Sequence, residues 1–272
     1  MKIFKNRYSL YKEISKINNL SFVPTMGGFH KGHKYLIKTA LKKTGRCIVS
    51  IYVNPKQFNS NQDFKTYPRN LKKDLKILKK LKVDYVYLPN NKDIFGFKTS
   101  KKIFLHAFNK KLCGHYRKKH FPGVINVVNR FLDIIKPKFI FLGKKDFQQL
   151  FLISKHINKR KINTKVIACK SIREKNGVTC SSRNENLSTN ELKIASSVYH
   201  YIKKLKIKTK KNRSFKVNNK KIMNDFINLG VKKIDYIEIL NTNNLSSPKF
   251  YKDKYNIFIA YYVGKTRLID NI

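Results

Sequence analysis

Acidic residues are scarce in this chain of 272 residues, which has 15 Asp and Glu against 61 Lys and Arg and a formal net charge of +46. Such a charge would suit a nucleic-acid-binding protein, because basic surfaces attract phosphate backbones. The lysines are scattered through every segment instead, many on predicted solvated helix faces as at 72–82, and no basic tail, zinc-finger spacing or RNA-binding aromatic motif occurs. The excess of Lys, Asn, Ile, Phe and Tyr, whose codons are rich in A and T, would also follow from an AT-rich genome. We therefore expect no specific nucleic-acid partner.

Long apolar runs are also missing. Nowhere do 18 apolar residues stand together, and no apolar segment follows the basic stretch at 1–7. This pattern predicts neither membrane insertion nor export. The four cysteines, Cys47, Cys113, Cys169 and Cys180, form no C-x-x-C pair. Cys47 and Cys169 stand in apolar, strand-like runs, where a thiol is usually a small buried hydrophobe, and a reducing cytoplasm is the simplest location.

Two common nucleotide-binding signatures, the Walker A loop and the G-x-G-x-x-G fingerprint, are absent. What does occur is a short apolar run, then the segment 24–33 (PTMGGFHKGH), then an amphipathic run at 35–41. The pattern predicts a strand, a tight loop and a helix. His30 and His33 would share one face of the first helical turn, beside backbone N–H groups without a helical partner and the positive end of the helix dipole. Phosphate suits such a place, and the glycines allow a ligand to approach the backbone closely.

Other interpretations of this histidine pair remain. A single histidine at a helix start is more often a cap or a surface residue than a catalyst, but two in H-x-x-H after a glycine-rich loop favour a functional site. Zinc is less favoured, because helical metal pairs usually stand four residues apart with a glutamate between them, and no third ligand is evident nearby.

Strand-like and helix-like segments alternate over residues 1–170, which predicts an α/β, Rossmann-like domain with a parallel sheet. The expected strands after the first cover 47–53, 84–88, 139–142 and 165–169, and the expected helices cover 68–81, 124–135 and a segment from Asp146 onward. Ligands of such sheets bind beyond the carboxyl ends of the strands. The loops with the richest chemistry fall at such ends.

The pattern changes over residues 171–272, which predict a smaller α+β domain. Helices are expected near 188–206 and 218–229, and strands at 234–240, 256–263 and 266–269 with a hairpin turn at 262–266. The lysine-rich stretch 203–211 is expected to be a solvated loop or a helix end.

Four further loops carry polar clusters. The amides in 54–59 could bind hydroxyls and carboxylates, or they could serve ordinary turn chemistry. The basic residues of 113–123 could bind anions or be solvated. In 143–149, Lys145 suits a phosphate and Asp146 a metal or a ribose, although Asp146 suits a helix N-cap equally well. The segment 180–184 offers two hydroxyls and a guanidinium that could clamp phosphates.

Together these stretches resemble the pantothenate synthetase (pantoate:β-alanine ligase) family of the HIGH-motif nucleotidyltransferases. The resemblance covers nearly the whole chain. The matching segments are Pro24–Gly27 with His30 and His33, Ser50–Phe58, Asp63-Phe64, Tyr67–Arg69, Arg117 with His120-Phe121 and Gly123-Val124, Gly143 with Lys145–Gln149, Ser181–Asn184 with Leu187-Ser188, and Thr266–Asn271.

The resemblance implies that ATP and pantoate form pantoyl adenylate and pyrophosphate, and that β-alanine then attacks the adenylate to give pantothenate and AMP. It implies that His30 and His33 stabilise the α-phosphate, with His33 as the proton donor, and that Gln57 and Gln149 bind pantoate, Gln57 also binding β-alanine. The implied ATP-binding residues are Met26, Gly27, Gly28, Phe29, His30, Lys31, Gly32, His33, Gly143, Lys144, Lys145, Asp146, Ile172, Cys180, Ser181, Ser182 and Arg183.

Further expectations come from the same resemblance. Mg²⁺ would accompany ATP at Asp146, the domain at 171–272 would act as a lid, and the chain would form a homodimer through its N-terminal domain. Lys144 stands where the family usually has Glu, Cys180 where it has Met or Leu, and Lys118-Lys119 where it has Pro-Gly. These departures bear on ATP affinity rather than on the reaction type. We expect Lys144 to point outward into solvent. A different HIGH-type adenylyltransferase would share the two histidines but lack the pantoate glutamines.

Overall fold

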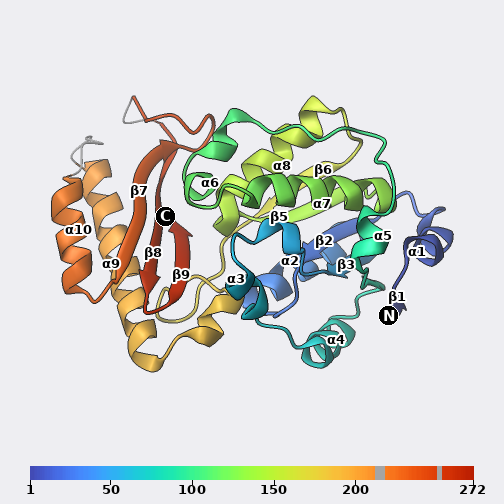
Figure 1. Ribbon diagram of the computed structural model, residues 1–272, viewed down its shortest axis with the longest axis horizontal. Helices are drawn as coiled ribbons and strands as arrows, with labels where there is room; N and C mark the ends of the chain where they lie inside the picture. Colours follow the sequence, from blue (N-terminus) through green and yellow to red (C-terminus); the bar gives the residue numbers. More distant parts are fainter. Residues whose placement is uncertain (212–217, 250–252) are drawn as a thin grey trace. The chain divides into compact units, whose positions relative to one another are not determined.

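The computed structural model describes residues 1–211, 218–249 and 253–272, and these fall into two compact units, Met1–Ser171 and Ile172–Ile272 (Figure 1). The first unit contains a six-stranded sheet in the order β1-β4-β3-β2-β5-β6, whose paired strands are all parallel. The second contains a three-stranded antiparallel sheet in the order β7-β8-β9. A parallel α/β unit followed by a smaller α+β unit confirms the predicted fold class.

The first unit holds most of the elements. Its strands are β1 (Lys2–Phe4), β2 (Ser21–Thr25), β3 (Cys47–Ile51), β4 (Tyr85–Tyr87), β5 (Phe139–Gly143) and β6 (Lys165–Cys169). Its helices are α1 (Arg7–Ile14), α2 (Lys31–Thr44), α3 (Asn61–Lys65), α4 (Leu71–Lys80), α5 (Asn91–Phe95), α6 (Cys113–Tyr116), α7 (His120–Ile135) and α8 (Phe147–Lys159). Short 3₁₀ turns join them, η1 (Pro55–Gln57), η2 (Ala107–Lys110) and η3 (Lys144–Asp146).

Helices bury both faces of the parallel sheet, and its inner strands are accordingly mostly apolar. On one face, Val23 and Val49 pack in a cluster with Ile37 of α2 and Leu78 of α4. On the other face, the centroid of the Phe131 ring on α7 lies 5.5 Å from that of Phe22, and the same ring contacts Tyr52 and Tyr87. The sheet is therefore a rigid platform for the loops at its carboxyl edge.

The direction of strand order reverses between the neighbouring strands β2 and β5, and ligands of such sheets bind in the crevice at the carboxyl ends of these strands. Pairing of β2 with β5 ends at Phe22 and Ile140, whereas pairing with β3 continues to Thr25. The N–H of Ser21 donates to the carbonyl of Arg46, the residue before β3, and so points to the β3 side. Since N–H groups alternate along a strand, the missing N–H of Pro24 lies on the β5 side. Pro24 thus stands where the two strands part.

The second unit is built from α9 (Thr189–Lys211), α10 (Asn219–Asn228), β7 (Lys233–Asn241), β8 (Tyr255–Val263) and β9 (Thr266–Asn271), with the turn η4 (Ser182–Asn186) before them. Its core joins apolar residues of both helices and the sheet, including Ile202, Phe226 and Ile257, each fully buried. The predicted hairpin turn is confirmed, because Val263 pairs with Thr266 around Gly264, which has a left-handed φ of +55°.

Several predicted boundaries were wrong. The helix expected at 68–81 begins at Leu71, because the Asn70 side chain caps it by accepting the N–H of Lys73. The helix expected near 188–206 continues to Lys211, so the stretch 203–211 is the end of α9, one of the two alternatives expected for it. The pattern raised no expectation for β1 and α1, which are short. Within the described part of the chain, no helix is long and apolar enough to cross a membrane.

His156 on α8 is fully buried and ties two segments together. Its Nδ1 accepts the N–H of Phe104 at 3.1 Å, and its Nε2 faces Asn129 Oδ1 at 2.9 Å, which fixes the neutral tautomer with the proton on Nε2. Burial, and secondarily the guanidinium of Arg160, lower the pKa of His156 to about 4. The ring is therefore neutral in the folded chain well into the acid range.

This histidine predicts a loss of stability in acid. Below pH 6.5, His156 binds a proton in the unfolded chain but not in the folded chain. The free energy of unfolding therefore falls as pH decreases toward 4. From this group alone we expect a decrease of about 2 kcal/mol between about pH 7 and pH 5. Urea denaturation followed by circular dichroism at both pH values would measure it. The His156→Gln variant should lack this part of the pH dependence, and an unchanged dependence in that variant would argue against the assignment.

Candidate active site

The histidine loop, residues 24–33, connects β2 to α2 and forms the N-terminal cap of that helix. His30 is the N-cap, and its Nδ1 accepts the N–H of Gly32 at 3.1 Å. His33 is the third helical residue, and its Nδ1 faces the N–H of His30 at 3.5 Å. The two side chains together make a reciprocal capping box. The centroids of their rings lie 4.0 Å apart.

This capping arrangement fixes the chemistry of both rings. Because each Nδ1 faces a backbone donor, each neutral imidazole carries its proton on Nε2. The pKa of His33 lies well below 6.5, chiefly because the ring is buried, and further because His30 and the ammonium of Lys145 are close. His33 is therefore neutral at pH 7 and offers an N–H donor rather than a positive charge.

The sequence placed the two rings beside N–H groups that have no partner within the helix, and the structure shows where two of these groups point. Those of His30 and Gly32 are directed at the histidine side chains. The structure also explains why histidine serves here. Each ring satisfies the helix terminus with one nitrogen and presents a donor on the other.

The loop is also held from α4. Both oxygens of Asp74 accept backbone N–H groups, Oδ2 from Gly28 and Oδ1 from Phe29, each at 2.9 Å. Asp74 is 2% exposed and was not identified from the sequence. A signal was present, since Asp74 is the only acidic residue of α4 and stands four residues before the buried Leu78, on the same helical face.

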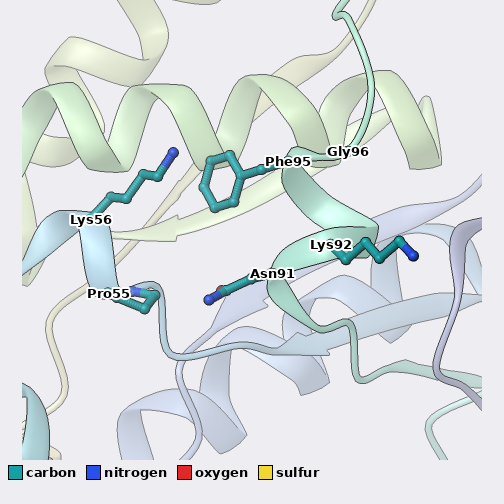
Figure 2. Close-up of a pocket in the computed structure, with 6 residues that line it drawn as sticks. All are labelled: Pro55, Lys56, Asn91, Lys92, Phe95 and Gly96. Carbon is teal, nitrogen blue, oxygen red and sulfur yellow. The ribbon is translucent and has the colours of Figure 1, made fainter.

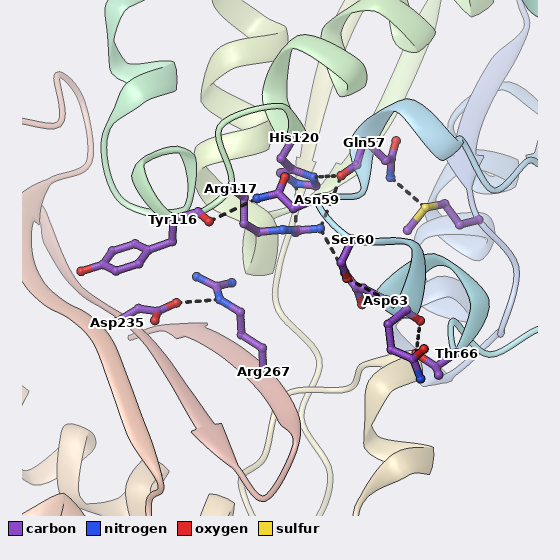
Figure 3. A network of polar contacts seen from close by, with 12 residues as sticks. Gln57, Asn59, Ser60, Asp63, Thr66, Tyr116, Arg117, His120, Asp235 and Arg267 are labelled. Atoms are coloured by element: carbon purple, nitrogen blue, oxygen red, sulfur yellow. Dashed lines mark hydrogen bonds and ion pairs between the residues drawn. The ribbon is translucent and has the colours of Figure 1, made fainter.

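Gln57, in η1 after β3, is buried and lies against the histidine loop. Its Nε2 donates to Met26 Sδ at 2.8 Å, and its Oε1 accepts from Asn54 at 3.3 Å. Its backbone carbonyl lies 2.8 Å from Nδ1 of His120, while the Arg117 guanidinium donates to the same carbonyl at 3.4 Å (Figure 3). The structure thus brings Gln57 and Met26 together and holds Gln57 by its main chain.

The two glutamines at the start of α8 differ in their roles. Gln148 is buried, and its side chain accepts from the N–H of Cys113 and donates to the carbonyls of Phe108 and Lys111. Gln149 is half-buried, and within the described residues its side chain makes no hydrogen bond. Successive helical residues point in different directions. The pair therefore divides into a structural glutamine and one with unused hydrogen-bonding capacity.

The loop after β5 places a cation and a carboxylate beside the crevice. Lys145 Nζ lies 3.4 Å from Asp146 Oδ1, and the Lys145 side chain is 19% exposed. Asp146 is the N-cap residue of α8, but its side chain makes no capping hydrogen bond. Lys144 is exposed, in agreement with the expectation that it points outward. A Cβ on Gly143 would meet no atom within 4 Å, so open space adjoins the end of the strand.

In the second unit, the remaining candidate residues form one local structure. The N–H of Cys180 donates to the carbonyl of Ile172, and its buried thiol faces Glu174 Oε1 at 3.1 Å. Ser181 Oγ accepts the N–H of Arg183 and caps η4. Ser182 is buried and Arg183 half-buried. All four cysteines are free and buried, which confirms the prediction for Cys47 and Cys169.

A cavity of about 410 Å³ lies between η1 and α5 (Figure 2). Its lining consists of Pro55, Lys56, Asn91, Lys92, Phe95 and Gly96, and none of these belongs to the histidine loop. The ammonium of Lys56 lies 4.0 Å from the centroid of the Phe95 ring. Of the two lysines in the lining, Lys56 is thus engaged in a cation–π contact. We assign it no ligand.

Comparison with known proteins identifies relatives along the whole chain. A family model described as Pantoate-beta-alanine ligase matches residues 2–272. The pantothenate synthetase of Francisella tularensis subsp. novicida (strain U112) is 38% identical over 269 residues, which cover 98% of this chain and 94% of that protein. The pantothenate synthetase of Ruthia magnifica subsp. Calyptogena magnifica is 39% identical over 256 residues, covering 93% and 90% of the two chains.

Comparison with solved structures identifies proteins with the same names. The pantoate-beta-alanine ligase from Francisella tularensis, crystallised with beta-gamma ATP and beta-alanine, superposes with a TM-score of 0.85 at 36% identity, covering 100% of this chain and 97% of that one. Pantothenate synthetase from Thermus thermophilus gives a TM-score of 0.89 at 25% identity, covering 100% and 99%.

Proposed function

The chain belongs to the pantoate-beta-alanine ligase family, and on that premise we propose that its histidine loop binds the phosphates of ATP during formation of pantoyl adenylate. The pantoate carboxylate attacks the α-phosphorus and pyrophosphate leaves. The amine of β-alanine then attacks the acyl carbon of the adenylate, giving pantothenate and AMP. The observation that carries the assignment of roles is the pair of imidazoles, 4.0 Å apart, whose Nδ1 atoms are used in the cap and whose Nε2 atoms carry the protons.

No covalent enzyme intermediate is needed, so catalysis depends on positioning the reactants and stabilising charge at the α-phosphate. The low pKa of His33 favours a neutral hydrogen-bond donor over a proton donor. A donor fixed by a helix cap does not need to reorganise when negative charge develops on the phosphate oxygens. His30 supplies a second such donor.

Lys145 and Asp146 are proposed to face the polyphosphate. The lysine adds a positive charge near the histidine pair, since its ammonium contributes to the low pKa of His33. No group of three or more metal-ligating side chains exists among the described residues. A single carboxylate, the 46% exposed Asp146, nevertheless fits Mg²⁺, which binds through few protein ligands when phosphates supply the others. Bound Mg²⁺ would neutralise charge on the phosphates.

The remaining nucleotide contacts stay predictions. The other residues proposed to line the ATP site are Met26, Gly27, Gly28, Phe29, Lys31, Gly32, Gly143 and Lys144 in the first unit and Ile172 with Cys180–Arg183 in the second. The second unit is proposed to act as a lid, and the strand order of the first supports a Rossmann-like assignment.

Gln57 and Gln149 are proposed to bind pantoate, with Gln57 also binding β-alanine. The unused amide of Gln149 supports this role, because a site that hydrogen-bonds hydroxyls discriminates strongly against analogues that lack them. We expect Gln149→Ala to raise the KM for pantoate far more than the KM for ATP, as steady-state kinetics would show. Gln148→Ala is the matched control and should lower the melting temperature without this selectivity. Equal changes in both KM values for Gln149→Ala would make that residue structural.

We also propose that the enzyme is a cytoplasmic homodimer that associates through its N-terminal unit. The four free, buried cysteines support a reducing location, and the family resemblance supports the dimer. Sedimentation at micromolar concentration is expected to give about twice the 32.1 kDa mass of the chain. A stable monomer under those conditions would refute the dimer.

A further inference from the structure

Asp74 is a buried carboxylate that the proposed chemistry does not use. It is 2% exposed, and its two oxygens each accept one backbone N–H of the histidine loop at 2.9 Å. A carboxylate can be buried at acceptable cost only when such donors replace its hydration. The rest of α4 is rich in exposed lysine, so this acidic residue is the exception in its helix.

The loop that Asp74 contacts has a backbone conformation that favours glycine. Gly27 and Gly28 have consecutive left-handed φ values of +81° and +64°. A Cβ on Gly27 would come within 2.8 Å of Asp74 Oδ2, so the loop packs directly on the carboxylate. Two glycines in succession have many alternative conformations, and a contact that selects one of them lowers the entropy of the loop before substrate binds.

The contact is connected to the histidines through the main chain. Asp74 fixes the N–H of Phe29, the next residue is the N-cap His30, and the N–H of His30 is directed at Nδ1 of His33. The tether therefore sets the planes of the Gly27–Gly28 and Gly28–Phe29 peptides, which directly precede the peptide that joins Phe29 to the cap residue His30. It reaches the loop from α4, an element separate from the helix that carries the two rings.

We propose that Asp74 is a positioning residue for the adenylation step, holding the Gly28–Phe29 backbone so that the Nε2 donors of His30 and His33 are aligned before ATP binds. The proposal rests on the proposed function. Asp74 does not touch the reacting atoms in this account, and it acts only through the loop.

The Asp74→Asn variant tests the proposal most sharply. Asparagine has nearly the same shape but only one acceptor oxygen, so its NH₂ would face one of the two backbone N–H groups. We expect the kcat for AMP formation to fall about 10- to 100-fold, the scale of a misplaced catalytic group, while the KM for pantoate changes less than about twofold. The His33 resonances, followed by NMR, should titrate at a different pH from those of the wild type.

Asp93→Asn is the matched control. Asp93 is also a buried carboxylate of the first unit, and it accepts the N–H of Arg7 and the hydroxyl of Tyr87 instead of loop amides. This substitution should lower the melting temperature but leave both kcat and the His33 titration near those of the wild type. Similar kcat values for the two variants, with His33 titrating as in the wild type, would overturn the proposal.

A second variant covers the case in which Asp74→Asn is too unstable to assay. Asp74→Glu keeps both acceptor oxygens, and we expect it to retain more activity than Asp74→Ala; equal losses would overturn the proposal. Should the wild type form no AMP from pantoate and β-alanine, the proposed function fails, but the NMR titration still decides whether Asp74 positions His33.

Discussion

Replacing His33 with alanine is expected to lower the rate of adenylate formation about 100-fold or more while the chain still folds, because one preorganised donor to a developing negative charge is removed. The fold should persist because α2 keeps its N-cap, in which His30 accepts the N–H of Gly32. Pyrophosphate release from ATP and pantoate, without β-alanine, measures this step alone. Near-normal release would contradict the role assigned to His33.

The His33→Gln variant separates a hydrogen-bond donor from a proton donor. Glutamine at the third helical position can accept the N–H of His30 as in other capping boxes, and it still offers a neutral N–H. We therefore expect His33→Gln to be less impaired than His33→Ala. Equal impairment would favour proton transfer over hydrogen bonding. The wild type offers a further check. Because the pKa of His33 is low, the ring is already neutral at pH 6.5, and the rate of adenylation should not fall through its deprotonation as pH rises from 6.5 to about 8.

The second large effect concerns Lys145. Its side chain is mostly buried, pairs with Asp146 and lies close enough to His33 to lower the pKa of that ring. A cation that is largely removed from water interacts with a phosphate much more strongly than a solvated one. We expect Lys145→Ala to reduce adenylation severely, by at least about 10-fold, as pyrophosphate release would measure.

Its neighbour Lys144 is the control. Lys144 is exposed. An ion pair with an exposed charge contributes only about 0 to 1 kcal/mol, and at physiological salt the charge is screened over a length of about 8 Å. Lys144→Glu should change the KM for ATP less than about fivefold. Should Lys144→Glu cripple adenylation while Lys145→Ala is tolerated, the assignment of this loop to the nucleotide would be wrong by one residue, and so would the role of Asp146.

Those features of the fold and site that depend on local pattern were predictable from the sequence. The segment 24–33 contains its own strand end, glycines and histidine spacing, so the loop and the shared face of the two rings could be expected. The exposure of Lys144 followed from its neighbour, because adjacent side chains do not point at one phosphate. The lysines of 72–82 are exposed, as their helical spacing indicated.

What the sequence did not reveal depends on contacts between distant residues. Asp74 meets Gly28 across 46 positions, and although its place on the apolar face of α4 indicates burial, no local pattern identifies its partner. The Nδ1 atoms of His30 and His33 accept backbone N–H groups only in particular side-chain rotamers, and a sequence does not reveal rotamers. The start of α4 was misplaced because Pro68 suited a first helical turn, whereas Asn70 made the cap.

The measurement that tests the central claim most directly is AMP release with each substrate omitted in turn. We expect AMP only when ATP, pantoate and β-alanine are all present, and pyrophosphate when ATP and pantoate are present without β-alanine. Release of AMP that does not require pantoate, or that is indifferent to β-alanine, would contradict the account.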